Sequence, residues 1–425
     1  MNPVHSWSGP ARVVFGLLGI ALADIAHAGG LTLYEIGTPD LGLAAAGYAA
    51  RAQDAATVLT NPAGMTRLNQ SQFMLSGQAL YGVAQFTPNS LTTPSLGTND
   101  GGNAVGFLPG GSAFFVWSAT PDLKVGFGLF SNFGLSESYE DAWVGRYYVQ
   151  SATLLGLSMM PSVAYRFLPW FSAGVSVNVM YGILRDTAAV NGILPSTPDG
   201  TLEVESNAWG VGVEVGVLFE PAEGTRIGAT YTSPMSLGFS ATPSITNVPA
   251  GSPFLALQKP VSLGMTVPQG VMLSVYQEVV PGLALLANVG WQNWSQFGKV
   301  DVQVSDPSQT SVTVNVNYKD TWHGALGAQI KAAEGWLVST GISYDSSMIA
   351  NDQRTPALPT GSAWRFAAGV QHPVSESVEL GLAYEFLWGG TLPMDQQRGP
   401  LSGRIAGSYQ NTLINFFAFN VNWKL

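Results

Sequence analysis

Large apolar residues alternate with small or polar residues over most of the chain. The segments 170–184 (WFSAGVSVNVMYGIL), 207–219 (NAWGVGVEVGVLF) and 376–388 (ESVELGLAYEFLW) place an apolar residue at nearly every second position. A period of two predicts strands with one apolar face. The opposite face carries mainly Gly, Ser, Ala and Asn. A sandwich core would fill its inward face with large side chains, so the pattern predicts the lipid-facing strands of an outer-membrane barrel.

Roughly fourteen segments share this alternation, an even number as bacterial barrels require. Short connections, such as ATPD (119–122) and VVPG (279–282), alternate with long ones, such as 87–109 and 186–202. Short periplasmic turns and long outer loops are typical of such barrels. We therefore predict an all-β fold, a transmembrane antiparallel β-barrel over residues 70–425 with both ends on the periplasmic side. The expected strands start near Ser71, Gly111, Asp122, Ala152, Trp170, Glu203, Thr225, Lys259, Gly282, Val312, Gly335, Ser362, Glu376 and Leu413.

Composition narrows the class of protein further. Charged residues make up 10% of the 425 residues, against about 25% in soluble proteins. Mean hydropathy is +0.19, yet no stretch approaches the ~20 apolar residues of a membrane helix. The net charge of −10 argues against a nucleic-acid partner. The absence of cysteine excludes disulfides and thiolate metal sites, and we expect neither a metal nor a cofactor.

Both ends of the chain carry targeting patterns. An apolar run, 13–23 (VVFGLLGIALA), follows Arg12, and residues 26–28 (AHA) match a cleavage site. We predict a signal peptide over residues 1–28; an N-terminal membrane anchor is the alternative, although the run is short for a span. The last segment, 414–425 (INFFAFNVNWKL), has the pattern that the barrel assembly machinery receives. We therefore expect the outer membrane of a Gram-negative cell, with membrane lipid and lipopolysaccharide around the wall.

Residues 29–69 differ from the rest because they show no sustained alternation. Small residues dominate from Leu41 to Ala56, and charged residues are few. A disordered periplasmic tail is one interpretation, but such tails are usually charged and poor in apolar residues. We favour a hatch that plugs the lumen, where irregular backbone is tolerated at membrane depth. Asn61, Pro62 and Ala63 predict a stiff corner before the first strand, because Pro62 restricts its own backbone and that of Asn61.

Residues 31–68 (LTLYEIGTPDLGLAAAGYAARAQDAATVLTNPAGMTRL) resemble the N-terminal hatch of the outer-membrane long-chain fatty acid transport proteins, the FadL family. The matching positions are Glu35, Leu41-Gly42, Asp54-Ala55 and Asn61-Pro62-Ala63. Further matches follow in order along the chain: SNFGL (131–135), NAWGVG (207–212), WSQF (294–297), YKD (318–320) and TGISYDSS (340–347). The resemblance implies a fourteen-stranded barrel with a hatch and passive uptake of hydrophobic compounds. Long-chain fatty acids are the expected substrates and aromatic hydrocarbons the alternative.

The resemblance also implies a route through the wall. In the family, the ligand is held near the hatch and leaves sideways at an inward kink of the third strand, here DLKVGFGLFSNFGL (122–135). The alternation in this strand falters at Ser131, Asn132, Phe133 and Gly134, and a glycine-bearing interruption indicates a bulge. From the residues alone, an ordinary strand end that runs into the outer loop fits equally well. We predict gating roles for the corner residues Asn61, Pro62 and Ala63 and for Ser131, Asn132 and Gly134.

Candidate ligand contacts follow from the same resemblance. Leu31 aligns with an apolar residue that reaches the family's pocket, so Leu31, Leu33 and Ile36 are candidates, with packing of the hatch against the wall as the alternative. Phe133, in the interrupted stretch of the third strand, is a further candidate. A fatty acid would also need a cation for its carboxylate. The candidate cations are Lys319, Arg146 and Arg365, each of which could instead pair with a lumen acid such as Glu214, Glu379 or Glu385.

Three other functions compete with uptake of hydrophobic compounds. An enzyme would need a catalytic set, but only His323 and His372 remain after signal removal. His323 has no nucleophile signature nearby, and His372 lies in the short turn 371–376 (QHPVSE) on the predicted periplasmic side, so we expect no enzymatic activity. A general porin would need a charged constriction and an open lumen. An adhesin could use the long outer loops, but such loops are common to barrels and indicate no ligand.

Overall fold

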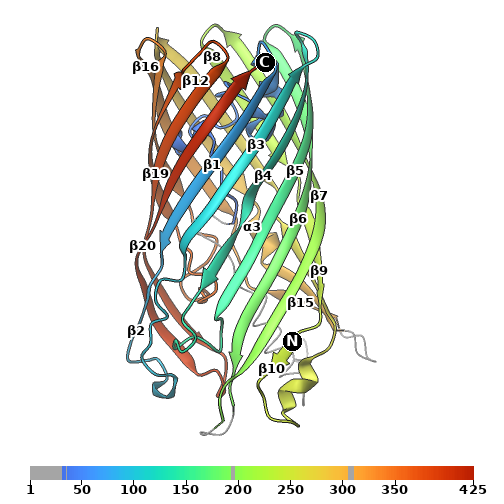
Figure 1. Ribbon diagram of the computed structural model, residues 1–425, viewed down its shortest axis with the longest axis vertical. Helices are drawn as coiled ribbons and strands as arrows, with labels where there is room; N and C mark the ends of the chain where they lie inside the picture. The colour runs from blue at the N-terminus through green and yellow to red at the C-terminus, as the bar shows by residue number, and fades with distance from the viewer. Residues whose placement is uncertain (1–30, 35, 193–196, 305–310) are drawn as a thin grey trace, which may run out of the picture.

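The computed structural model describes residues 31–34, 36–192, 197–304 and 311–425, so the predicted signal peptide, Gly29 and Glu35 lie outside the described residues. In this part of the chain, fourteen antiparallel strands close into a barrel, because β1 pairs with β20 (Figure 1). The barrel strands are β1 (Gln72–Val83), β3 (Gly106–Ser118), β4 (Leu123–Ser138), β5 (Ser151–Leu168), β6 (Phe171–Val190), β7 (Gly200–Ala222), β8 (Thr225–Thr232), β12 (Gly270–Val280), β13 (Leu283–Gln292), β16 (Thr321–Ala333), β17 (Trp336–Asp345), β18 (Ala363–Pro373), β19 (Val378–Gln397) and β20 (Arg404–Lys424). The predicted fold class and strand number are confirmed.

Short turns join the strands at one end of the barrel, and the C-terminus lies at the same end (Figure 1). Gly224, Gly282 and Gly335 adopt positive φ values in three of these turns, and the strand register shifts beside each of them. Glycine permits this left-handed conformation without the cost of a side chain. The turns agree with the short connections that the sequence predicts for the periplasmic side.

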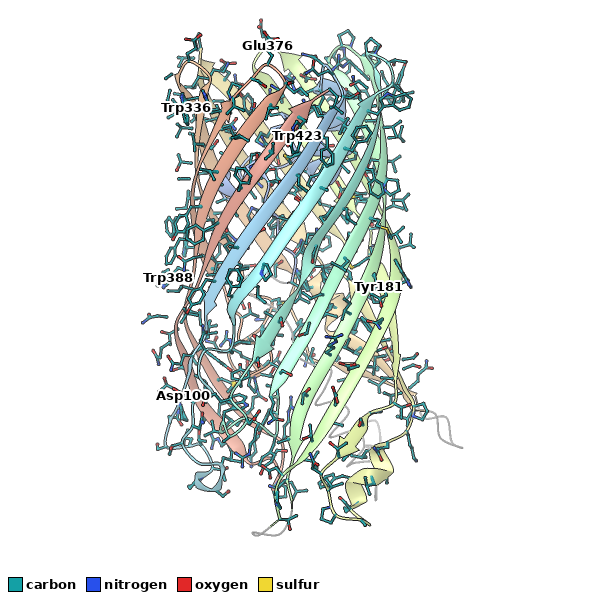
Figure 2. All side chains as sticks on the ribbon, in the orientation of Figure 1. Asp100, Tyr181, Trp336, Glu376, Trp388 and Trp423 are labelled. Carbon is teal, nitrogen blue, oxygen red and sulfur yellow. The ribbon has the colours of Figure 1, made fainter. Side chains whose placement is uncertain are left out.

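The wall has the predicted two faces. On β16, Leu326 is 63% exposed and its neighbour Ala325 is 5% exposed, as expected for a side chain in lipid beside one in the lumen. Trp336 and Trp423 lie near the short-turn end, whereas Trp388 and Tyr181 lie at a second level nearer the long loops (Figure 2). These residues mark two aromatic girdles, and the strands extend past the second girdle toward the long-loop end. No helix in the described ranges is long and apolar enough to span a membrane.

The part of the chain that precedes β1 lies inside the barrel, visible in blue within the wall (Figure 1). We call residues 36–69 the lumen segment. It contains η1 (Pro39–Leu43), α2 (Thr57–Thr60) and η2 (Pro62–Arg67), and its residues from Ile36 to Thr66 are buried with one exception, Gln53. The short helices contact opposite walls, η1 against β16–β20 and η2 against β4–β7. The segment therefore crosses the lumen rather than extending away from the barrel.

A second, four-stranded sheet forms at the long-loop end. It consists of β15 (Ser311–Asn315), β14 (Lys299–Val304), β11 (Val261–Val267) and β9 (Met235–Ala241), in that order, and we call it the mouth sheet. Leu237 and Phe239 of β9 contact the backbone at Gly182, and Leu237 also contacts Gly210, on the inward faces of β6 and β7. The mouth sheet therefore folds over the inner wall. The remaining short elements are β2 (Phe86–Pro88), β10 (Ser244–Thr246), η3 (Pro94–Leu96), η4 (Pro253–Leu257) and α3 (Trp294–Phe297).

The mouth sheet corrects two of the expected strand starts. The alternation near Lys259 belongs to β11 and that near Val312 to β15, whereas the barrel strands begin at Gly270 and Thr321. The alternating pattern is similar in both sheets, because β11 buries one face and Val314 of β15 packs against the same hydrophobic cluster. Periodicity alone therefore could not separate a barrel strand from its extension in the mouth sheet.

Candidate ligand-binding site

The third barrel strand, β4, is interrupted at Ser131 and Asn132. Its register against β5 shifts between Phe130 and Phe133, so these two residues form a bulge. Its pairing with β3 ends at the Ser112–Phe130 pair, although β3 continues along β1 to Gly106. The structure therefore has a real interruption at the predicted position and not an ordinary strand end, because β4 continues to Ser138.

Beyond the bulge, β4 pairs with the start of the described chain instead of β3. We call residues 31–34 the N-terminal segment. The backbone N–H of Leu33 donates to the carbonyl of Asn132 (2.8 Å), and the N–H of Gly134 donates to the carbonyl of Leu31 (2.9 Å). These bonds frame a bridge between Thr32 and Phe133. Phe133 is 3% exposed and packs with Leu31. In a continuous wall, these backbone groups of Asn132 and Gly134 would bond to β3. Here they bond to residues 31 and 33 instead.

Gly134 is required at this bend for steric reasons. Its φ is +134°, and a Cβ at this position would lie 2.1 Å from the carbonyl oxygen of Leu154 on β5. No side chain fits at that distance without moving the backbone of β5. The glycine that interrupts the alternation in the sequence therefore permits the close approach of β4 to its neighbour.

A cavity of about 100 Å³ adjoins the bulge. Thr32 and Tyr34 contribute from the N-terminal segment, and Asn132 and Phe133 from the bulge. The remaining lining residues come from the lumen segment, the inner wall, and the links to the mouth sheet: Tyr48, Leu59, Met160, Asn178, Met180, Glu214, Thr230, Thr232, Ser233, Met235, Val267, Pro268, Gly270, Val271, Met272, Trp291 and Gln292. The cavity lining thus combines apolar side chains with eight Ser, Thr, Asn, Gln and Glu residues, and polar groups of this kind orient the ligand in binding sites.

The predicted ligand contacts Leu31, Leu33 and Ile36 lie near this cavity but are not among its lining residues. Leu31 is 1% exposed and belongs to the cluster of Phe133, whereas Ile36 packs with residues of the lumen segment and accepts a hydrogen bond from Ser112 Oγ (2.8 Å). Leu33 packs against two neighbouring clusters. Of the described N-terminal residues, Thr32 and Tyr34 line the cavity instead, because alternate residues of an extended segment point to opposite sides.

The candidate cations lie outside the cavity. Arg365 is 1% exposed and forms ion pairs with Asp345 (2.9 Å) and Glu385 (3.1 Å), and Asp345 also contacts His323 Nδ1 (2.8 Å). This arrangement matches the alternative in which Arg365 pairs with a lumen acid. Lys319 is exposed. None of the three candidate cations is among the described residues that line the cavity.

Arg146 belongs to a separate cluster in the loop between β4 and β5. Arg146 Nε donates to Asp199 Oδ2 (2.8 Å), and the guanidinium lies 4.4 Å from the centre of the Tyr147 ring. Tyr147 Oη donates to Asp199 Oδ1 (2.6 Å). Burial, with this hydrogen bond, raises the pKa of Tyr147 to about 12. The cluster joins two outer loops, and Arg146 is occupied by its acidic partner there.

The predicted corner is fastened to both the lumen segment and the wall. Asn61 Nδ2 donates to the carbonyls of Ala49 (2.7 Å) and Val217 (3.0 Å), and its Oδ1 accepts from the N–H of Ala63 (3.0 Å). Asn61 is extended, as expected before proline, and Pro62 begins η2. A Cβ at Gly216 of β7 would lie 2.0 Å from Asn61 Oδ1. The wall therefore carries glycine where the corner docks.

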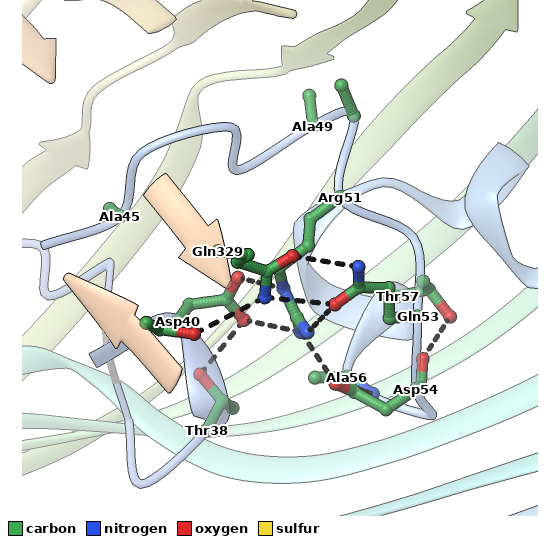
Figure 3. Close-up of polar contacts among 12 residues, drawn as sticks. Thr38, Asp40, Ala45, Ala49, Arg51, Gln53, Asp54, Ala56, Thr57 and Gln329 are labelled. Carbon is green, nitrogen blue, oxygen red and sulfur yellow. Dashed lines mark hydrogen bonds and ion pairs between the residues drawn. The ribbon is translucent and has the colours of Figure 1, made fainter. Parts of the chain in front are cut away.

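A buried ion cluster that the sequence did not predict organises the lumen segment (Figure 3). Arg51 is 2% exposed and contacts Asp40 Oδ1 (2.8 Å) and Asp54 Oδ2 (2.6 Å). Beside it, Gln53 and Gln329 join the segment to β16 (2.8 Å). The only advance signal was the presence of isolated charges within a stretch of small residues. Their fit to one another becomes visible only in the folded segment.

Comparison with known proteins identifies the family. The family model for "Outer membrane protein transport protein (OMPP1/FadL/TodX)" matches residues 19–424. The chain belongs to this family. The resemblance found in the hatch-like segment and the expected outer-membrane location are both confirmed, since relatives in the family are themselves named outer membrane proteins.

Individual relatives cover most of the chain. Outer membrane protein P1 of Haemophilus influenzae is 26% identical over 86% of this chain and 87% of the relative. A long-chain fatty acid transport protein of Escherichia coli O6:H1 is also 26% identical, over 86% of this chain and 90% of its own length. A solved Pseudomonas aeruginosa FadL homologue has a TM-score of 0.80 at 20% identity and covers 93% of this chain and 99% of its own. The toluene transporter TodX of Pseudomonas putida has a TM-score of 0.64 at 16% identity, with 87% and 94% coverage. At these identities the solved structures show the shared fold.

Proposed function

We propose that this family member is a passive outer-membrane channel for the uptake of hydrophobic compounds and has no enzymatic activity. The observation that carries the proposal is the cavity beside the β4 bulge, at the point where the N-terminal segment replaces β3 as the partner of β4. Relatives named as long-chain fatty acid transport proteins and structures described as toluene transporters support a hydrophobic substrate.

We further propose that the ligand leaves sideways, between β3 and β4, and that the lumen segment acts as the hatch. Beyond Ser112, β3 has no described hydrogen-bonded pairing with β4, which supports an opening in the wall at this position. Apolar surface favours a non-aqueous environment by roughly 25 cal/mol per Å². A lateral exit into the bilayer keeps a hydrophobic ligand out of water, and its escape into lipid supplies the driving force without a coupled energy source.

Two substrate classes follow from different observations. The family resemblance and the named relatives support long-chain fatty acids. The cavity supports the second class, uncharged aromatic hydrocarbons, because none of its described lining residues is Lys, Arg or His, so a buried carboxylate would lack a cation for a charge-assisted hydrogen bond. Outer-membrane lipid and lipopolysaccharide surround the proposed channel, and the barrel assembly machinery is its proposed insertion partner.

Uptake in a deletion strain tests this function. Cells that express the full chain are expected to take up labelled oleate or toluene faster than cells with an empty vector. Gly134→Ala is expected to reduce uptake several-fold, because the new Cβ would displace β4 or β5 at the bulge. Gly324→Ala on β16 is the matched control, since a Cβ there meets no atom within 4 Å.

Surface protein must be equal in all strains, measured by immunoblotting of outer-membrane fractions. If oleate and toluene both enter at the empty-vector rate, the uptake function is wrong. If uptake is normal in Gly134→Ala at equal surface level, the lateral exit at the β4 bulge is wrong while the transport function stands.

A further inference from the structure

Three acceptor oxygens on the cavity wall have no hydrogen-bond partner in the described part of the structure. They are Oε1 of Glu214, Oδ1 of Asn178 and Oδ1 of Asn132. Glu214 on β7 pairs in register with Ser176 on β6, so Asn178 is its diagonal neighbour on the inward face. Asn132 belongs to the β4 bulge. Buried acceptors are normally satisfied, so the same cavity holds three that a ligand could satisfy.

Glu214 differs from the other buried acids of the site. It is 7% exposed, and among the described residues its side chain accepts one hydrogen bond, from Thr232 Oγ1 to Oε2 at 3.3 Å. By contrast, Asp40 and Asp54 are paired with Arg51, and Asp345 and Glu385 are paired with Arg365. In these two clusters, each buried carboxylate has an arginine partner. Glu214 has none in the described residues, and it faces the cavity instead.

The apolar part of the cavity wall favours an apolar ligand body. Four methionines line it, Met160, Met180, Met235 and Met272, together with aromatic residues. Methionine side chains adapt to ligands of different shape and contact aromatic rings favourably. A ligand carboxylate would lie beside the Glu214 carboxyl group, with no cation among the described lining residues to offset the charge of the ligand. The wall therefore accepts an apolar ligand but opposes an anionic one.

We propose that the cavity selects uncharged apolar molecules that carry a hydroxyl donor, such as phenols and alcohols, and that Glu214 accepts the donor's hydrogen bond. The inference rests on the proposed transport function and names the ligand class of the same site. The O–H group donates to Glu214 Oε1, while the apolar body of the ligand contacts the methionines. The amide oxygens of Asn178 and Asn132 offer further acceptors at the same wall.

Three ring-matched probes test this ligand class: p-cresol, toluene and p-toluate. Their binding to the purified full chain in detergent is measured at pH 7 by equilibrium dialysis, and the binding to detergent alone is subtracted. We expect p-cresol to bind about tenfold more tightly than p-toluate. Glu214→Leu should lower the preference for p-cresol over toluene by about tenfold, the effect of one buried hydrogen bond to a carboxylate. Glu214→Lys should shift the preference toward p-toluate.

Two variants separate ligand selection from folding. Glu214→Gln keeps an acceptor oxygen and the side-chain size, so it should still prefer p-cresol to p-toluate. Glu205→Leu, at an exposed position of the same strand where Glu205 contacts Arg185, should leave all three affinities unchanged. The inference is overturned if p-toluate binds the unmodified protein as tightly as p-cresol, or if Glu214→Leu leaves the p-cresol preference intact. Loss of uptake of every hydrophobic compound in cells would instead contradict the transport function.

Discussion

At the scale of single residues, glycines on the inner wall decide how closely the lumen segment can approach. A Cβ at Gly228 would lie 1.9 Å from the carbonyl oxygen of Ala49, and one at Gly341 would lie 1.8 Å from that of Leu43. Both positions face backbone of the lumen segment. The small residues on the polar face of the predicted strands are therefore contact positions, and a larger side chain at either of them would push the segment away from the wall.

Asn61 is the residue whose loss should loosen the lumen segment most directly. Asn61→Ala removes one accepted and two donated hydrogen bonds at a buried site. We expect the segment to lose about 3–5 kcal/mol of stability against local opening, at about 1 kcal/mol for each of the three bonds plus the cost of unsatisfied carbonyls. Hydrogen exchange of residues 49–63 should rise. Asn69→Ala, at an exposed position of the same segment, is the control.

Uptake by the same two variants addresses gating. If the corner holds the hatch until the ligand is released, Asn61→Ala should change the uptake rate at an equal surface level. Unchanged uptake together with increased hydrogen exchange would show that the corner only anchors the segment and has no gating role.

At the scale of elements, β4 changes partner partway along its length. Toward the short turns it pairs with β3, and beyond the bulge its backbone bonds go to residues 31–33. The sequence left two interpretations of the SNFG interruption open, a kink or a strand end. The pairing shows a bulge inside a strand that continues and not a strand end, because the hydrogen-bonding groups that leave β3 find another backbone.

A disulfide between the two bridge partners tests whether the N-terminal segment must move. Thr32 and Phe133 form a bridge flanked by hydrogen bonds, a geometry with Cα atoms about 4.5 Å apart, which is within the range that a disulfide spans. Because the chain has no cysteine, Thr32→Cys combined with Phe133→Cys can form one bond only. We expect uptake to stop in the oxidised double variant and to recover after reduction.

The two single-cysteine variants control for the loss of the native side chains. Full uptake by a double variant whose disulfide is complete, as measured by thiol labelling, would show that residues 31–33 stay on β4 during transport.

At the scale of the whole molecule, the wall is a closed sheet, and two parts of the chain lie inside it. The wall closes where β1 pairs with β20 from Gln72–Lys424 to Val83–Leu413. The lumen is occupied by residues 36–69, and the mouth sheet folds over the inner wall at the long-loop end. A general porin would need an open aqueous lumen, so these two obstructions distinguish the protein from one.

Single-channel conductance in planar bilayers tests whether the lumen segment blocks the flow of ions through the barrel. The full chain should show no large, stable ion current, whereas a variant that lacks residues 37–68 should conduct, because the deletion leaves the fourteen wall strands but removes the segment that spans the lumen. Circular dichroism establishes that the deletion variant retains its strands. A large current from the full chain, or no gain on deletion, would contradict the plug.

The sequence by itself determined the wall of this barrel, because lipid on one side and a lumen on the other impose a local period of two. It also located the Asn61-Pro62 corner and the interruption at Ser131–Gly134, since proline and glycine act on their own backbone. Even so, local alternation could not show that the segments near Lys259 and Val312 belong to the mouth sheet, because β9, β11 and β14 of this sheet also bury one face.

Tertiary structure decided the contents of the lumen. It placed Thr32 and Tyr34, rather than Leu31 and Leu33, on the cavity wall. It paired Arg365 with Asp345 and Glu385 and left Glu214 without a cation in the described residues. The physical reason is that a charge is neutralised by its neighbours in space. Strand register sets those neighbours, and they lie 20 residues from Arg365 in the sequence.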